Sequence, residues 1–103
     1  MRNMAEMQRM LKSAKEMQDR IQKELAEIRI EGTSGGGMVT VVLDGHKAPH
    51  SLRLEKEVVD RDEIDMLQDL ILAAFNDASS KVDASVGQKL GNLGANLKIP
   101  GLF

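Results

Sequence analysis

The chain has no cysteine, tryptophan or tyrosine, and only two phenylalanines among its 103 residues. The absence of cysteine excludes disulfides, thiolate zinc sites and thiol catalysis, and it suits a reducing compartment. With so few aromatic residues, the interior must be built from Leu, Ile, Val, Ala and the seven Met. An aliphatic core in one small domain is completed more easily by a second subunit, so we expect a dimer.

Long apolar runs are also missing. No segment approaches the roughly 20 apolar residues that a membrane-spanning helix needs, and the N-terminal segment is polar and Met-rich, unlike a signal peptide. We therefore expect a cytoplasmic protein with no membrane partner.

Charge is unevenly distributed around a formal net value of −2. Residues 1–23 carry six basic and three acidic side chains, whereas residues 55–77 carry two basic and eight acidic ones. From residue 78 onward the balance is positive again. A chain with such an asymmetry can bind a polyanion through its basic end although its net charge is negative.

Apolar residues at spacings of three and four predict a helix over residues 2–27. They are Met4, Met7, Met10, Leu11, Ala14, Met17, Ile21, Leu25 and Ile28, and we call them the Met stripe. Such a helix is about 39 Å long, whereas a typical strand spans about 17–20 Å, so the helix should overhang its sheet. An uncovered apolar stripe is an interaction surface, and a second copy is its simplest partner.

The middle of the chain reads as a three-stranded antiparallel sheet. Alternation over 28–31 predicts a short strand, the β-branched run 38–43 predicts a central strand, and Leu52 and Leu54 mark a third strand after Pro49. The glycine-rich segment 32–37 lacks the Lys-Ser/Thr of a phosphate-binding loop and is followed by a strand. It is therefore interpreted as a hairpin turn.

A second long helix follows the sheet, with apolar residues at helical spacing from Ile64 to Ala78. The pattern weakens after Val82, where glycines recur. We therefore predict an α+β fold, with a long helix, a three-stranded antiparallel sheet and a second long helix, forming a homodimer. Residues 1–86 form the α-β-β-β-α domain, and residues 87–103 form a glycine-rich, mobile tail.

Neither catalytic nor metal chemistry is indicated. His46 and His50 straddle a turn without a third ligand and are interpreted as solvated loop histidines. The acidic residues between 60 and 69 lack the glycine of a calcium loop, and no serine or threonine lies in a nucleophile-elbow context. We expect no enzyme activity, no cofactor, no metal and no small-molecule substrate.

The order of these motifs over nearly the whole chain resembles the YbaB/EbfC family of bacterial nucleoid-associated DNA-binding proteins. The residues that carry the resemblance are Met17-Gln18, Gly32, Gly35-Gly36-Gly37, Gly45, Asp69-Leu70 and Ala74-Phe75-Asn76-Asp77-Ala78. The resemblance implies a homodimer that binds double-stranded DNA, is associated with the nucleoid in the cytoplasm, and contributes to nucleoid organisation and gene regulation.

The basic residues of the first helix project away from the Met stripe, with Lys15 nearer its flank, and are the DNA-binding candidates. Local pairs such as Lys12 with Glu16 offer an alternative, in which this face is merely solvated. We rank Arg9, Lys12 and Lys15 first because they meet few acidic neighbours. The other candidates are Lys81, Lys89, Arg2, Arg20 and Lys23.

A protein–protein interaction module is the alternative function. In that case the Met stripe, or the acidic start of the second helix, docks another protein. Salt separates the two readings, because phosphate binding weakens steeply with ionic strength whereas apolar docking does not.

Overall fold

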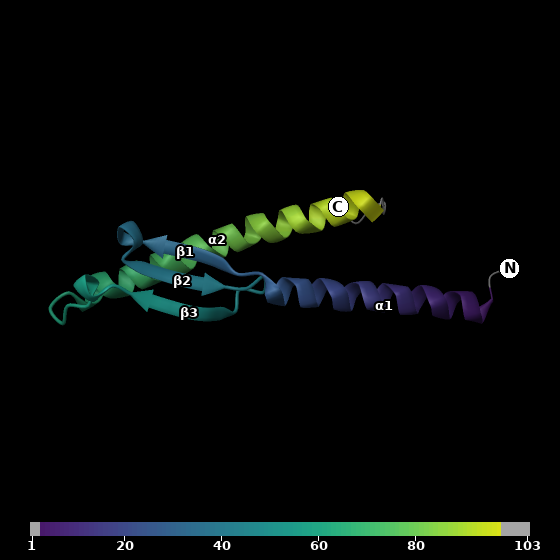
Figure 1. Cartoon of the computed structure of the whole chain (residues 1–103), viewed down its shortest axis with the longest axis horizontal. Coiled ribbons are helices and arrows are strands. Elements are labelled where there is room, and N and C mark those ends of the chain that lie inside the picture. The colour runs from purple at the N-terminus through teal and green to yellow at the C-terminus, as the bar shows by residue number, and fades with distance from the viewer. Residues whose placement is uncertain (1–2, 98–103) are drawn as a thin grey trace.

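The computed structural model describes residues 3–97, and the side chains of residues 3–92. Within 3–97 the order of helices and strands is α1 (Met4–Glu27), β1 (Ile30–Ser34), β2 (Val39–Leu43), β3 (Pro49–Leu54) and α2 (Ile64–Leu97), with short 3₁₀ turns at Gly35–Gly37 and Lys56–Val58. The predicted α+β layout is confirmed. Figure 1 shows α1 projecting from one end of the sheet. The radius of gyration is 20.0 Å, against about 13 Å for a compact chain of this length.

The three strands form one antiparallel sheet in the order β1-β2-β3. Val41 at the centre of β2 lies opposite Gly32 on β1 and Leu52 on β3. The continuous β-branched run therefore occupies the central strand, as the sequence indicated. β3 is exposed along nearly its whole length, because α2 packs against β1 and β2 rather than against β3.

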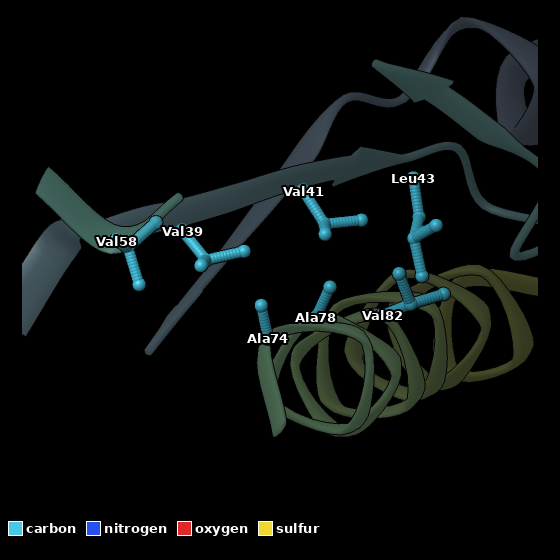
Figure 2. Close-up of a cluster of buried hydrophobic side chains, with 7 residues drawn as sticks. All are labelled: Val39, Val41, Leu43, Val58, Ala74, Ala78 and Val82. Atoms are coloured by element: carbon cyan, nitrogen blue, oxygen red, sulfur yellow. The ribbon is translucent and has the colours of Figure 1, made fainter. Parts of the chain in front are cut away.

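The core lies between α2 and one face of β1 and β2, and its side chains are small. In Figure 2, side chains of β2 point toward the facing side chains of α2, and Val58 closes one end. The fully enclosed members are Val39, Val41, Leu43, Val58, Ala74, Ala78 and Val82. Phe75 is only partly buried and packs against the edge of this cluster.

The approach of α2 to β1 depends on Gly32. A Cβ added at Gly32 would lie 2.3 Å from the Ala78 nitrogen and 2.4 Å from the Ala74 oxygen. Both atoms belong to the backbone of α2, so no rotamer change could relieve the contact. The backbone nitrogen of Thr33 also donates a hydrogen bond to Asp77 Oδ2 at 2.9 Å. Helix and strand are therefore joined by both close packing and a polar contact.

The glycine hairpin between β1 and β2 has the predicted left-handed backbone. Gly35, Gly36 and Gly37 have φ values of 61°, 69° and 94°, which residues with a side chain rarely adopt. Ser34 precedes them and donates its hydroxyl to the Leu70 carbonyl oxygen of α2. The loop is therefore a tight reversal anchored on α2 rather than a phosphate cradle.

α2 extends further than the apolar pattern indicated. It passes the predicted domain boundary at residue 86 and includes Gly87 and Gly91. A glycine within a helix costs only about 1 kcal/mol relative to alanine, so it weakens a helix without ending it. The mobility of residues 87–103 stays a prediction, and residues 98–103 lie outside the described residues.

Candidate nucleic-acid interface

α1 is a helix with two unlike exposed faces. It starts at the N-cap residue Asn3, whose Oδ1 accepts a hydrogen bond from the backbone nitrogen of Glu6 at 2.9 Å. Within the described residues, the segment 9–21 makes no hydrogen bond or ion pair with the sheet or with α2. We call this projecting part of α1 the arm.

One face of α1 is the Met stripe, whose N-terminal half the single chain leaves uncovered. Met4, Met7, Met10 and Leu11 are 72%, 54%, 69% and 68% exposed. An open depression of about 300 Å³ is lined by Met7, Met10, Leu11 and Ala14. Contiguous apolar surface of this kind marks an interaction site.

The opposite face of α1 is basic. Its exposed cations are Arg9, Lys12, Arg20 and Lys23, with Lys15 at the flank of the Met stripe, and the exposed Glu16 and Asp19 lie among them. Among the residues that the structure describes, none of these five cations makes an ion pair, so local pairs such as Lys12 with Glu16 are not formed. The arm therefore carries positive charge that no neighbouring carboxylate neutralises at contact distance.

The remaining candidate cations differ from this group. Lys81 forms an ion pair with Asp77 one helical turn earlier, with 2.9 Å between Nζ and Oδ2. That contact and the Thr33 N–H lower the pKa of Asp77 from its usual value, with the Thr33 hydrogen bond as the larger cause. Lys89 lies 3.7 Å from Glu24 of α1. Arg2 lies outside the described residues.

The β2–β3 turn, residues 44–48, meets the base of α1, and sequence reasoning missed this role. The Gly45 nitrogen donates to the Leu25 oxygen at 2.8 Å, and His46 Nε2 lies 3.4 Å from the Gln22 oxygen. Leu25 is the buried residue of α1. The Asp44-Gly45 pair predicted a turn, but no local signal revealed what that turn contacts.

Asp44 organises this turn. Its side chain is buried, and its oxygens accept hydrogen bonds from His50 Nε2 and from the backbone nitrogens of His46 and Ala48 at 2.8–3.0 Å. The His50 contact is the largest cause that lowers the Asp44 pKa from 3.8 to about 2. His50 is exposed, as the sequence interpretation had it, but it lies in β3 rather than in a loop and its ring hydrogen-bonds to Asp44.

The chemistry available on α1 is electrostatic and apolar. Across residues 3–97, no group of three or more His, Cys, Asp or Glu side chains is arranged to hold a metal ion. In the same range, neither helix combines the length and the apolar character that crossing a bilayer requires. What α1 offers a partner is a row of cations on one side and a Met stripe on the other.

Comparison with known proteins identifies the family. The model of the YbaB/EbfC DNA-binding family matches residues 1–97. A nucleoid-associated protein of Geobacillus kaustophilus is 56% identical over 79 residues, which cover 77% of this chain and 73% of that protein. A nucleoid-associated protein of Pelotomaculum thermopropionicum is 43% identical over 100 residues, 94% of this chain and 95% of that protein.

The fold also has a counterpart among solved structures. The crystal structure of an uncharacterised protein from Helicobacter pylori has a TM-score of 0.68 at 18% sequence identity, covering 96% of this chain and all of that one. At this identity the likeness concerns the fold alone. With the family model matched over nearly the whole chain, the resemblance inferred from the sequence is confirmed, and the chain belongs to the YbaB/EbfC DNA-binding family.

Proposed function

We propose that this protein binds double-stranded DNA as a homodimer, with the basic face of α1 on the duplex phosphates. The observation that carries the proposal is the row of five exposed cations on α1, none of them paired with a carboxylate among the described residues. Membership of a DNA-binding family supports the choice of partner.

The names of the relatives support a cellular location and a biological role for this chain. Several are named nucleoid-associated proteins, so we propose that this chain acts at the nucleoid in the cytoplasm, in nucleoid organisation and gene regulation. Binding to duplex DNA, rather than catalysis, is the activity proposed for it.

Phosphate contact is the mode of binding that the chemistry favours. The stretch from Arg9 to Lys23 is about 21 Å long, which equals the rise of about six base pairs along the duplex axis. α1 contains no aromatic side chain on which a base could stack. Affinity should come from released counterions, and any sequence preference from the shape of the duplex.

A DNA titration at two salt concentrations tests this mode. Changing Arg9, Lys12 and Lys15 to Ala should weaken binding to unrelated duplexes to a similar extent, because phosphates carry no sequence information. The slope of log affinity against log salt should flatten by up to about five, if each side chain makes one contact in each subunit.

The matched control removes cations from the other end of the molecule. Lys56 and Arg61 are exposed and lie beside the acidic start of α2. Changing both to Ala should leave the affinity and the salt slope close to wild type. A triple variant of α1 that binds with unaltered affinity and slope would remove the arm from the DNA surface and leave Lys81 and Lys89 as the better candidates.

A second copy of the chain is the proposed cover for the Met stripe. Pairing along this stripe would bury the exposed Met7, Met10 and Leu11 and leave both basic faces open to DNA. Sedimentation equilibrium should give a dimer at micromolar concentration. Leu11→Glu should shift it toward monomer, whereas Ala5→Glu, on the opposite side of α1, should not. A folded wild-type monomer at that concentration contradicts this pairing.

The protein-interaction module remains the second candidate, and the same exposed Met stripe favours it. In that case the stripe docks a different protein, or the acidic start of α2 does. Complex formation through the stripe would then change little between low and high salt, in contrast to DNA binding. A wild-type protein that shows no salt-dependent DNA binding would favour this candidate.

A further inference from the structure

The β2–β3 turn is held by hydrogen bonds among its own residues and His50. Asp44 Oδ1 accepts hydrogen bonds from the backbone nitrogens of His46 at 2.8 Å and Ala48 at 3.0 Å, while Oδ2 lies 3.0 Å from His50 Nε2. Backbone bonds link Asp44 to Ala48 and Lys47, each at 3.0 Å. Lys47 has a φ of 66°, in the left-handed region. The turn is therefore held in one conformation by one buried carboxylate.

This turn touches the last turns of α1 at close range. The Gly45 nitrogen donates to the Leu25 oxygen at 2.8 Å. A Cβ at Gly45 would lie 2.6 Å from the same oxygen and 3.0 Å from the Leu25 Cα. Both atoms belong to the helix backbone, so any side chain at this position would push α1 away from the turn.

Another polar contact, between α1 and α2, is weaker. Lys89 and Glu24 form an ion pair of 3.7 Å between exposed side chains, and pairs of this kind contribute little. Lys47 joins the turn to Asp83 of α2 at 2.9 Å. The turn therefore contacts both helices at the end of the sheet where α1 ends, which Figure 1 shows.

A small change at this base is amplified along α1. Arg9 lies sixteen residues before Leu25 in sequence, about 24 Å away along the helix. A rotation of about 10° at Leu25 would move Arg9 by about 4 Å, which is more than the length of a charge-assisted hydrogen bond, about 2.7–2.9 Å, and so is enough to break a phosphate contact. The direction of α1 therefore decides which phosphates its cations reach.

We infer that the turn 44–48 fixes the direction of α1, and that Asp44 and Gly45 are positioning residues for DNA binding. The inference rests on the proposed function, since it assumes that the arm carries the DNA contacts. Neither residue contributes a cation, so their effect on binding passes through the placement of α1.

Spin labels can measure this placement without DNA, because the chain has no native cysteine. Ser13 on α1 and Ser80 on α2 are exposed and can be replaced by labelled cysteines. Labelled protein diluted with excess unlabelled protein reports the distance within one subunit. Gly45→Ala should shift or broaden this distance by several ångströms, whereas Gly87→Ala, where a Cβ meets nothing within 4 Å, should not.

DNA affinity is the second readout on the same variants. Gly45→Ala should bind DNA about tenfold more weakly, because two misdirected arms lose the advantage of binding together, while Gly87→Ala should bind as wild type. A folded Gly45→Ala variant with the wild-type distance overturns the inference, and so does one with a changed distance and unchanged affinity. Failure of the proposed function is seen separately, as unchanged binding by the Arg9, Lys12 and Lys15 variant.

Two substitutions at Asp44 give an independent test. Asp44→Asn retains an oxygen that can accept both backbone bonds and should keep the wild-type distance, whereas Asp44→Ala should shift it. If both variants keep the wild-type distance, Asp44 is not a positioning residue. Gly45→Ala retains every side chain of the turn, so it decides the question even if Asp44→Ala does not fold.

Discussion

The two helices of this protein differ in how much of their surface is buried against the sheet. α2 buries Ala74, Ala78 and Val82 almost completely against the sheet, whereas the buried residue of α1 is Leu25 at its base. The body, formed by the sheet and α2, therefore holds the contacts that stabilise the folded chain. The arm holds exposed cations and part of the Met stripe, of which Met10 and Leu11 stay exposed in the single chain. The comparison separates residues needed for folding from those available to a partner.

The largest effect on stability is expected where α2 meets β1. Gly32→Val should destabilise the fold by about 3 kcal/mol, because the added atoms meet backbone on α2 that cannot move without unpacking the core. Urea denaturation measures the loss. Gly87→Ala serves as the control and should be neutral or stabilising by up to about 1 kcal/mol. Equal stability of Gly32→Val and wild type would mean that the body is not the rigid part.

Phe75 comes next. Its replacement by Ala should cost about 2 kcal/mol, less than for a fully enclosed phenylalanine, since this ring is partly buried at the edge of the core. Leu72→Ala on the same helix, at a site 62% exposed, should cost well under half as much. A Phe75→Ala protein that melts like wild type yet loses DNA binding would move Phe75 from the body to the interface.

Acid should lower the stability of the fold by protonating Asp44 in the β2–β3 turn. The folded-state pKa of Asp44 is about 2, below its ordinary 3.8, so its ionised form stabilises the fold above pH 3.8. This contribution is lost as the pH falls through about 2. Urea denaturation between pH 5 and 2 should show a weaker acid dependence for Asp44→Asn than for wild type. Parallel curves for the two proteins would contradict a stabilising role for the Asp44 carboxylate.

The smallest effect on stability is expected on the arm. Changing Arg9, Lys12 and Lys15 to Ala removes exposed side chains that make no ion pair among the described residues. The free energy of unfolding should change by less than about 0.5 kcal/mol. A larger loss of stability, measured by thermal melting, would show that the basic face contributes to folding. The contrast between arm and body would then no longer hold.

Much of this architecture could be predicted from periodicity. The spacing of apolar residues predicted a helix over 2–27, close to the observed Met4–Glu27. The β-branched run identified the central strand. Both signals are local, because each depends on which residues lie on one side of a single helix or strand. The separation of basic and apolar faces on α1 followed from the same periodicity.

What could not be predicted depends on contacts between distant segments. No pattern along the chain indicates that Gly45 lies against Leu25, or that Lys89 pairs with Glu24. Spacing predicted local pairs along α1, but exposed side chains of this kind gain only tenths of a kcal/mol from pairing, so spacing alone does not decide whether they meet. The end of α2 was missed because isolated glycines weaken the apolar pattern without breaking the helix.

The glycine hairpin is a suitable site at which to attach a label or a tether. A Cβ at Gly36 or Gly37 would meet nothing within 4 Å, and the loop lies at the end of β1 opposite to the end that α1 precedes (Figure 1). A fluorophore, an affinity tag or a surface tether inserted there through a flexible, glycine-containing linker would keep the left-handed backbone available. The protein could then be immobilised with α1 facing solution, so that the attachment does not obstruct a partner that binds the arm.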